Sequence, residues 1–440
     1  MEEKYIIDTQ ENRDFLQENV KSLIDFGRSF PSPGGSSYYL GDDGTPWKER
    51  NRETWITSRM VHVYSIGHML RFPGCGALAE KGLNGLKEEL KDVKNGGWYA
   101  GVTCDGKPLE GKQCYAHAFV ILAASSALLA GIKGAKELLD DALELYDKRF
   151  WNEEEGLSCD TWNTEFTVLD SYRGLNANMH TVEAFLAAAD VLGDEKYRVR
   201  AGRIISNVIK WAEENEYRLP EHFSSEWKAE LDMNKDKPDD PFKPYGATPG
   251  HGIEWARLIT QWAKSTELLS DEKKAVGSSS ESEKESSKGK VKDDTDGYIK
   301  AACALYERAV SDAWNADGAL GIVYTTDWEG KPVVHDRMHW TLAEAINTSA
   351  VLYRVTGKKR YSEDYSMFLK YLDDTVLDHK TGSWFHQLDE NNRLKATVWP
   401  GKSDLYHALQ SMLIPYNNIN LSIAKAVSST IGRDFQLLDN

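Results

Sequence analysis

The sequence predicts an all-α protein with the architecture of an (α/α)6 barrel, in which outer and inner helices alternate around a closed ring. Apolar residues recur at helical spacing along most of the 440-residue chain, and long strand patterns are absent. Six segments share one pattern, because each opens with polar and aromatic residues and continues into small apolar ones. Repeated units of this kind form solenoids or closed toroids. Residues near the six openings are spaced 58 to 89 positions apart, at Arg59, His117, His180, His251, Trp340 and His407.

The six apolar segments are expected to be the inner helices. A helix that is apolar on all sides belongs inside a protein rather than on its surface. The expected ranges are residues 54–70, 114–131, 178–193, 250–269, 339–357 and 404–416.

The outer helices are expected in the charged, amphipathic segments between these ranges. Short aromatic hairpins with Gly, Asp and Asn turn residues precede several inner helices. Ring closure brings these β-hairpins and the N-terminal ends of the inner helices to one active-site mouth. An open solenoid is the alternative, but its units are normally shorter and its ends carry polar caps. The clearest outer helices are residues 12–30, 135–151, 196–215 and 360–378, and the hairpins are residues 96–108, 321–332 and 384–393.

We expect residues 1–440 to form one catalytic domain with a low-complexity surface insertion at residues 271–296. The insertion holds no aromatic residue and almost no apolar one. Such a composition buries too little surface to offset its ordering entropy. We therefore expect a mobile loop between two helices. A domain boundary is the alternative, although the helical pattern resumes directly after the insertion.

Composition disfavours several classes of partner and location. The formal net charge of −16 disfavours nucleic acid and anionic membranes. The N-terminus lacks the basic and apolar regions of a signal peptide, and no apolar run is long enough to span a membrane. The five cysteines are scattered and odd in number, which is typical of reduced thiols in a cytoplasmic protein. A homo-oligomer is left open by the sequence.

Three histidines occupy equivalent places at inner-helix openings. A single histidine is usually structural, but His180, His251 and His407 would face one another across one mouth. Glu183 and Glu254 follow the first two by three residues, on the same helix face. A carboxylate fixes the tautomer of an imidazole and raises its basicity, while a helix N-terminus disfavours the imidazolium. These opposing effects hold a histidine near neutrality, where it shuttles protons best.

A metal pair is the alternative use of two His-x-x-Glu motifs. The di-iron bundle motif runs in the opposite order, Glu-x-x-His, with further glutamates. The sequence contains no His-Glu-x-x-His and no Cys-x-x-Cys. We therefore expect no metal and no cofactor.

The remaining side chains at the openings suit a monosaccharide substrate. Arg59 follows an apolar stretch, where it forms either a buried ion pair or an anchor for substrate oxygens. Asn176 either caps its helix or binds sugar hydroxyls. Glu344 either forms a salt bridge or binds substrate.

Aromatic residues also gather at the openings. The chain has fourteen tryptophans, and aromatic rings beyond core needs often line concave sites on which sugars stack. Trp55, Tyr115 and Trp340 are individually more often core residues. Together they form a ring suited to the face of a pyranose.

Six stretches of the chain together resemble the N-acylglucosamine 2-epimerase superfamily, and within it the metal-independent aldose–ketose isomerases acting on mannose or on sulfoquinovose. They are WITSRMVHVYS, GGWYAGV, NANMHTVEAFL, TPGHGIEWARL, GALGIVYTTDWEGKPVV and DLYHALQ. The resemblance covers nearly the whole chain outside the insertion and implies an (α/α)6 barrel. It implies catalytic or substrate positions for Arg59, His180, His251 and His407, and pocket positions for Trp55, Tyr115, Asn176, Glu254, Trp340 and Glu344.

Three positions depart from the sulfoquinovose-specific pattern. Lys243 stands where the family commonly has an arginine, and His386 and Ser403 stand where sulfoquinovose-type members have glutamines. A sulfonate needs a planar fork or several donors, and lysine does not replace arginine there. We therefore expect mannose–fructose interconversion, with lyxose as a secondary substrate and Lys243 and His386 in the substrate site. A sulfoquinovose–sulfofructose isomerase and a sugar 2-epimerase are the alternatives.

The expected chemistry is proton transfer through a cis-enediol, with His251 and His407 as the acid/base pair and Arg59 stabilising the enediolate oxygens. Two other classes of function are alternatives to an isomerase. Glycoside hydrolysis needs two carboxylates on opposite sides of a cleft, and Glu254 and Glu344 are candidates. A noncatalytic sugar-binding toroid needs the aromatic residues but not the histidines.

Overall fold

The computed structural model describes residues 2–276 and 281–430, with side chains for residues 2–269 and 295–430. Within these ranges, inner helices form a closed ring. Each packs against the next along the chain, and α12 packs back against α2. These helices are α2 (Thr54–Met69), α4 (Cys114–Leu129), α6 (Leu175–Leu192), α8 (Pro249–Val276), α10 (His339–Thr356) and α12 (Tyr406–Leu413).

The outer helices alternate with the inner ones, as the sequence predicts, and confirm the (α/α)6 barrel. They are amphipathic: α5 buries Leu138, Leu139, Ala142 and Tyr146 at helical spacing. In contrast, every residue of α2 except His68 is buried. The outer helices are α1 (Gln10–Phe26), α3 (Cys75–Asn84), α5 (Ala135–Arg149), α7 (Glu195–Glu214), α9 (Glu281–Ala313) and α11 (Lys359–Tyr371).

Short helical segments complete the helical part. The π-helical turns η3 and η4 continue α3 and α11, and α13 packs on α2, α4 and α6. The segments are η1 (Glu3–Tyr5), η2 (Gly27–Ser29), η3 (Gly85–Glu89), η4 (Leu372–Val376), η5 (Ile414–Tyr416) and α13 (Ile423–Thr430).

Two-residue and three-residue strands surround the mouth and pair antiparallel. Strands that directly precede α2, α4, α6 and α10 pair with strands in the connection to the following inner helix, as β3–β4, β5–β8, β9–β10 and β13–β14. The strands therefore link successive repeats, in addition to forming local hairpins such as β11–β12. The strands are β1 (Tyr39–Leu40), β2 (Pro46–Trp47), β3 (Arg52–Glu53), β4 (Gly101–Val102), β5 (Lys112–Gln113), β6 (Trp151–Asn152), β7 (Leu157–Ser158), β8 (Thr161–Trp162), β9 (Arg173–Gly174), β10 (His222–Phe223), β11 (Thr325–Thr326), β12 (Pro332–Val334), β13 (Arg337–Met338) and β14 (Gln387–Leu388).

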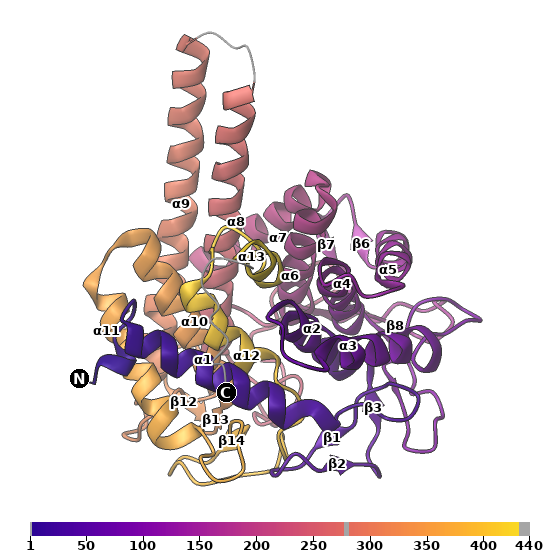
Figure 1. The fold of residues 1–440 in the computed structure, drawn as a ribbon. Coiled ribbons are helices and arrows are strands. Elements are labelled where there is room, and N and C mark those ends of the chain that lie inside the picture. The colour runs from indigo at the N-terminus through magenta and orange to yellow at the C-terminus, as the bar shows by residue number, and fades with distance from the viewer. Residues whose placement is uncertain (1, 277–280, 431–440) are drawn as a thin grey trace.

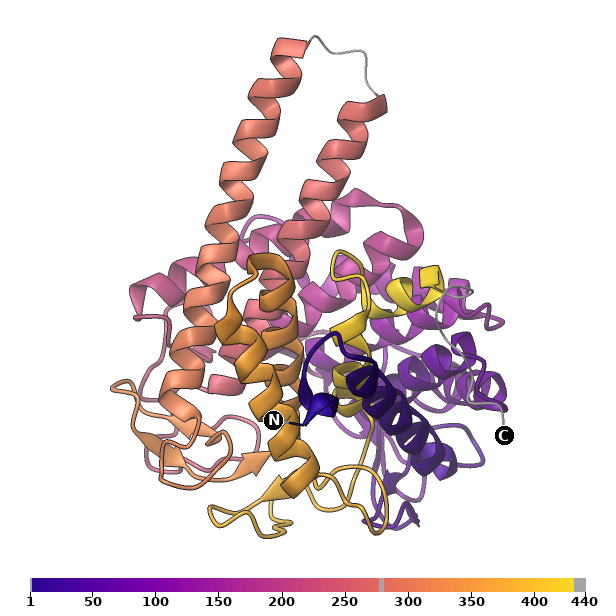
Figure 2. The same ribbon diagram turned by 60° about the vertical axis from the view of Figure 1, so that its left-hand side comes forward.

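Strands β1–β3 and β12–β14 lie at the lower edge of Figure 1, and α8 and α9 extend from the opposite edge. Helix α8 begins at the mouth with Pro249 and ends in this extension at Val276. Figure 2 shows the extended parts of α8 and α9 side by side, away from the barrel body. The mouth and the extension are therefore on opposite faces of the ring.

The expected loop at residues 271–296 differs from the structure. Helix α8 continues to Val276, and α9 already begins at Glu281, so helical backbone covers most of the segment. A polar, Lys- and Glu-rich sequence without Pro is compatible with a helix even where it lacks an apolar face. Residues 277–280 of the expected loop lie outside the described part of the chain.

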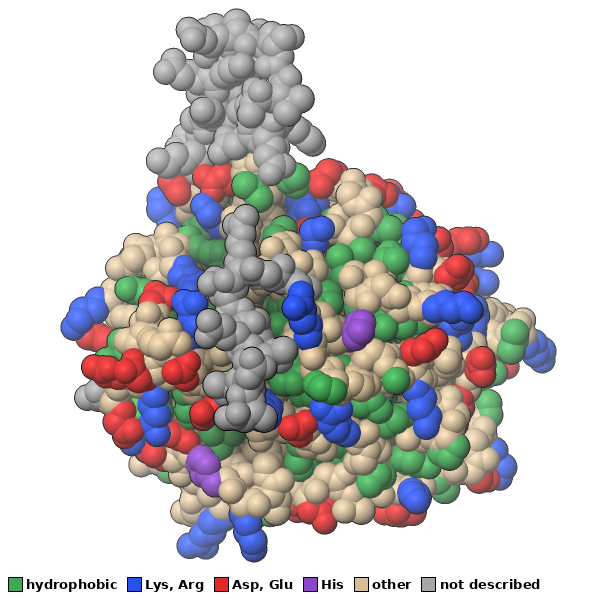
Figure 3. Space-filling model, viewed as in Figure 1, with side chains coloured by type: hydrophobic (Ala, Val, Ile, Leu, Met, Phe, Trp, Pro, Cys, Tyr) green, Lys and Arg blue, Asp and Glu red, His purple; other side chains and the backbone are tan. Residues whose placement is uncertain are grey.

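The surface carries mixed charge. Figure 3 shows Lys and Arg side chains interspersed with Asp and Glu across one face. Among the described residues, no helix is both long and apolar enough to cross a membrane. The five cysteines all lie in the described ranges and are unpaired, as expected for reduced thiols.

Candidate active site

The sequence-predicted residues at the helix openings meet inside the mouth. The rings of Tyr115 and His180 have centroids 5.1 Å apart, and those of His180 and His407 are 6.5 Å apart. The ring centroid of Trp340 lies 5.9 Å from that of His407 and 4.9 Å from that of His251. All these side chains come from the first or second turns of α4, α6, α8, α10 and α12, which explains why ring closure brings them together.

His117 does not join this cluster, although its spacing predicts that it should. Its Nδ1 lies 2.7 Å from the Gln113 carbonyl oxygen, and its Nε2 accepts the Trp98 backbone N–H at 3.1 Å. Both nitrogens are therefore engaged by backbone, and burial lowers the pKa of His117 to about 3. This histidine has a structural role between α4 and the preceding hairpin.

Each of the three mouth histidines has a glutamate at Nδ1. The distances to the carboxylate oxygens are 3.5 Å for His180 and Glu183, 2.9 Å for His251 and Glu221, and 3.1 Å for His407 and Glu344. A carboxylate at Nδ1 accepts its N–H and leaves Nε2 of a neutral imidazole with a free lone pair. The arrangement thus provides three histidine–carboxylate pairs, each with Nε2 available as a base.

The three-residue spacing of histidine and glutamate predicts one of these pairs correctly and another wrongly. Glu183 contacts His180 as predicted, but Glu254 does not pair with His251. The side chain of Glu254 instead lies beside Arg257, and His251 bonds to Glu221, which stands thirty positions earlier, directly before β10. Helical spacing does not predict Glu221, or the contact of Arg257 with Glu344, because these partners are distant in sequence.

Three carboxyl groups and one guanidinium form the floor of the site. Arg257 donates from Nε to Glu344 at 2.7 Å and from a terminal nitrogen to Glu254 at 3.4 Å. Burial, together with the negative charge of Glu344, raises the pKa of Glu254 well above its ordinary value. This shift favours the protonated form of Glu254, and Arg257 balances part of the remaining negative charge.

Glu183 remains ionised in the same surroundings. Burial alone would raise the pKa of Glu183, but its bond to His180 and the charge of Arg257 hold this pKa below the ordinary range. Tyr406 donates its hydroxyl to Glu183, and Gln410 donates its amide at 3.3 Å. This carboxylate is thus fixed by groups from α6 and α12.

The histidines that face these groups are neutral. Burial lowers the pKa of His180 to about 4, against the opposing effect of Glu183. Burial and the positive charge of Arg59 place the pKa of His407 well below its usual range. At neutral pH both imidazoles therefore hold a lone pair that can accept a proton.

Arg59 is fixed at the edge of the histidine cluster. It donates to Asp404 at 3.2 Å and to the Tyr115 hydroxyl at 2.9 Å. Its guanidinium also lies over the rings of Trp55 and Tyr406, within 4.8 Å of each centroid. The buried ion pair expected from the sequence is therefore present, and the anchoring of substrate oxygens by Arg59 stays a prediction.

Three further predicted substrate residues are Lys243, His386 and Asn176. Lys243 Nζ lies 3.6 Å from the ring centroid of Tyr172 and is half-buried. His386 stacks on His339 with centroids 3.7 Å apart, and neither of its ring nitrogens has a partner. The side-chain oxygen of Asn176 is likewise buried and unpartnered. Unpaired buried polar atoms of this kind suit a ligand rich in hydroxyl groups.

Two groups of side chains bring potential metal ligands together. In the described residues, the ligand atoms within each group lie within 4.8 Å of one another. The carboxylates are, however, already bonded to Arg257, Tyr406 and Gln410, and Arg257 places a positive charge among them. The donor set therefore suits protons and a guanidinium better than a divalent ion. The groups are His180, Glu183 and Glu254, and Glu254, Glu344 and His407.

Known proteins with similar sequences share this architecture. A family model described as N-acylglucosamine 2-epimerase (GlcNAc 2-epimerase) matches residues 34–281 and 284–411. A D-mannose isomerase of Pseudomonas cannabina pv. alisalensis is 39% identical over 409 residues, which are 93% of each chain. A D-mannose isomerase of Thermobifida fusca is 37% identical over 424 residues, covering 96% of this chain and 98% of the relative.

Solved structures of other proteins are similar to this chain in fold. A crystal structure of D-mannose isomerase matches with a TM-score of 0.79 and 25% identity, covering 91% of this chain and 96% of the other. Cellobiose 2-epimerase from Spirochaeta thermophila DSM 6192 matches with a TM-score of 0.74 and 18% identity over 96% and 98% of the two chains, which shows the shared fold. The chain therefore belongs to the N-acylglucosamine 2-epimerase family and is an enzyme of the isomerase or epimerase type.

Proposed function

We propose that the protein interconverts D-mannose and D-fructose, and lyxose and xylulose more slowly, by histidine-mediated proton transfer. The observation that carries this proposal is the set of three histidine–carboxylate pairs around one buried space. The relatives named D-mannose isomerase support the choice of sugar.

The reaction requires few groups. After the pyranose opens, a histidine removes the C2 proton, an enediol forms, and the same proton or one from solvent is delivered to C1. A second histidine moves a proton between O1 and O2. We assign these roles to His407 and His251, with their order left open, and place His180 on the adjoining side of the substrate. Positioned acid/base groups contribute on the order of 10² to 10⁴-fold each.

Arg59 and the carboxylates complete this scheme. The guanidinium stabilises negative charge on the enediolate oxygens as the proton leaves. Each glutamate at Nδ1 stabilises the imidazolium that forms during transfer. The scheme uses no metal, and Arg257 supplies the positive charge among Glu183, Glu254 and Glu344.

A neutral hexose fits the outer mouth better than a sulfonate. Lys243 rests on Tyr172, and neutral His386 and Ser403 offer unpaired hydrogen-bonding atoms. Burial lowers the pKa of His386 well below its usual range, so this ring brings no positive charge to an anion.

Sugar 2-epimerisation is the second candidate. It needs bases on both faces of C2, and the 6.5 Å between the rings of His180 and His407 would suit two bases flanking one carbon. The two functions are separated by NMR of mannose, lyxose, glucose and sulfoquinovose incubated with the protein. Fructose from mannose supports the isomerase, and glucose without fructose supports the epimerase. Sulfofructose from sulfoquinovose, with mannose unchanged, would overturn the choice of a neutral hexose.

A further inference from the structure

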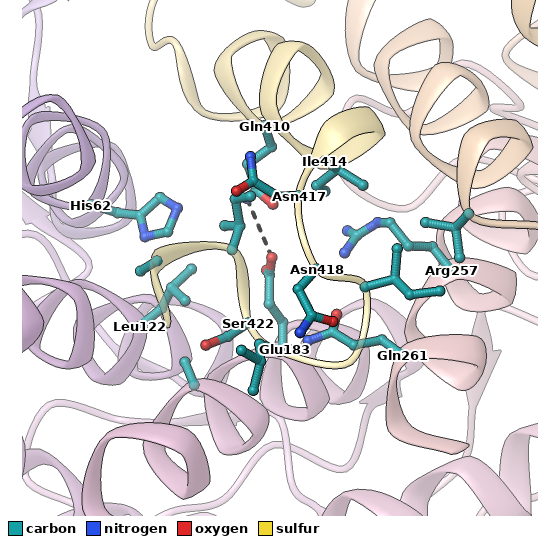
Figure 4. Close-up of a pocket in the computed structure, with 16 residues that line it drawn as sticks. His62, Leu122, Glu183, Arg257, Gln261, Gln410, Ile414, Asn417, Asn418 and Ser422 are labelled. Carbon is teal, nitrogen blue, oxygen red and sulfur yellow. Dashed lines mark hydrogen bonds between the residues drawn. The ribbon is translucent and has the colours of Figure 1, made fainter. Parts of the chain in front are cut away.

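A cavity lies beneath the histidine cluster, toward the barrel face opposite the mouth. Figure 4 shows it between α2, α6, α8 and the chain that follows α12. Its lining residues Ala187, Gln261 and Ile414 stand seven to ten positions after the histidines of their own repeats. At 1.5 Å per helical residue, this part of the cavity wall is roughly 10–15 Å deeper in the barrel than the histidines. Glu183 belongs to both, because it bonds to His180 and lines the cavity.

One wall of the cavity presents a ring nitrogen that needs a hydrogen-bond donor. His62 is buried, and its Nδ1 lies 2.7 Å from the Ser126 hydroxyl. That hydroxyl donates to the Leu122 carbonyl, so it accepts from His62 Nδ1–H. The Nε2 atom of a neutral His62 is then an acceptor, and it has no partner in the protein.

A second acceptor lies on the same cavity. Gln410 donates its amide nitrogen to Glu183 at 3.3 Å, and the reversed amide would set two oxygens against each other. Its oxygen is therefore the free end, and it is buried without a partner. The Ser422 hydroxyl, also buried on the cavity wall, has no partner either. A buried acceptor left unpaired is destabilising, so three such groups around one space indicate an occupant.

Water fits both the chemistry and the size of this space. About 30 Å³ is open to the centre of a water molecule, and one buried water needs roughly 10–15 Å³ by this measure. A water molecule offers two O–H donors, which match two acceptors in different walls. Asn418 lines the cavity and is exposed, so solvent has a route to it.

We propose that this cavity is a built water site that holds the Gln410 amide on Glu183, behind the His180 pair. The water donates to His62 Nε2 and to the Gln410 oxygen, and so hydrates the rear of the site while sugar occupies the mouth. The proposal that this hydration supports catalysis rests on the proposed isomerase function. The presence of the water does not.

A comparison of Ser422→Leu with Ser422→Ala separates the effect of losing the water from the effect of losing the Ser422 hydroxyl. Both variants lose the side-chain oxygen, but only leucine fills the space. The Ser422 backbone N–H, which bonds to Asp190 at 2.7 Å, is retained in both. Drying the cavity removes hydration from the rear of the Glu183 carboxylate, so Ser422→Leu should lose more turnover than Ser422→Ala. The charged and titratable groups around Glu183 are His62, His180, Glu254, Arg257, Glu344 and Tyr406.

The experiment combines a crystal structure with mannose kinetics over a range of pH. We expect ordered water bonded to His62 Nε2 and Gln410 in the wild type, and a kcat lower by roughly tenfold with little change in KM for Ser422→Leu alone. An empty wild-type cavity, or one filled by a metal ion, would overturn the proposal. Equal kinetics and pH profiles for the leucine and alanine variants would also overturn it. If the wild type does not isomerise mannose, the proposed function fails, while the crystal structure still tests the water site. If the leucine variant does not fold, the wild-type crystal structure still tests the water site directly.

Discussion

His251 Nδ1 lies 2.9 Å from Glu221, whose carboxyl group reaches it from the strand side of the mouth rather than from its own helix. The contact joins the opening of α8 to the residue directly before β10, in the connection between α7 and α8. Glu221 is buried, and its second oxygen has no partner. Its bond therefore serves to orient the imidazole of His251.

Glu221→Gln should lower kcat by about tenfold to 100-fold and leave KM nearly unchanged. The amide has the shape of the carboxyl group but no charge to stabilise the imidazolium that His251 becomes during transfer. Steady-state kinetics with mannose test this. Glu230→Gln is a control because Glu230 is a carboxylate of the same hairpin for which no bond to a catalytic histidine is seen. Equal losses in both variants would contradict the assigned role.

His251→Asn and His407→Asn should each reduce kcat by at least about 10²-fold. Asparagine keeps a polar side chain of similar size but cannot act as a base near neutral pH. Circular dichroism and thermal unfolding check that each variant folds. His117→Asn is informative beside them, because His117 bonds to backbone away from the cluster and its loss should lower stability rather than the turnover of folded protein. Full turnover in either site variant would remove that histidine from the mechanism.

Glu254→Gln should leave the free energy of unfolding at low pH nearly unchanged, because the amide replaces a carboxyl group that is already neutral. The pKa of Glu254 is raised on folding, so its contribution to stability is fully present below the unfolded pKa and is lost as pH rises. The variant lacks this loss, and its stability relative to wild type should increase from about pH 4.5 upward. Denaturant unfolding across this range measures the difference.

Glu344→Gln is the contrasting change in the same cluster. Glu344 bonds to Arg257 at 2.7 Å and to His407 at 3.1 Å, so its loss leaves a buried guanidinium poorly balanced. Breaking a buried pair in this way costs about 3–5 kcal/mol. A fall in stability for Glu254→Gln as large as that for Glu344→Gln would contradict the protonated state of Glu254.

The acid limb of activity should lie below the ordinary histidine range if His180 acts as a base. Burial lowers the pKa of His180 to about 4, so the imidazole stays neutral and basic down to that pH. The lowered pKa of His180 also affects the free energy of unfolding. The unfolded chain binds this proton near pH 6.5, so stability is lost as pH falls from there toward 4. The pH profile of kcat/KM, with unfolding followed in parallel, tests both. A His180 imidazole that titrates near pH 6.5 by NMR in fully folded protein would contradict a neutral, buried His180.

Replacing residues 271–295 by a short Gly-Ser turn should leave kcat and KM within about twofold. The extended parts of α8 and α9 stand away from the barrel, on the face opposite the mouth. Kinetics and thermal unfolding measure the effect. A large loss of activity would show that this pair of helices contacts the barrel or a second subunit in a way that supports the site.

The fold was predictable because its signal is periodic along the chain. Six apolar segments with polar openings determine six inner helices, and closure then places Arg59, His180, His251 and His407 together. The pair His180–Glu183 was also predictable, since three helical residues separate its members. The partners of His251 and His407 were not, because Glu221 and Glu344 reach them from other repeats. For residues 271–296, composition predicted a loop, but it shows only that the segment lacks a core-facing side, not that its backbone is irregular.

The most direct test of the central claim is NMR of mannose in D2O with protein that has been treated with a chelator and freed of it. We predict that fructose forms at the untreated rate and that solvent deuterium enters C1 of fructose or C2 of mannose, because a histidine carries the proton. Activity lost on chelation and restored by a divalent ion, with no solvent deuterium on carbon, would contradict the account and favour a metal-assisted hydride shift.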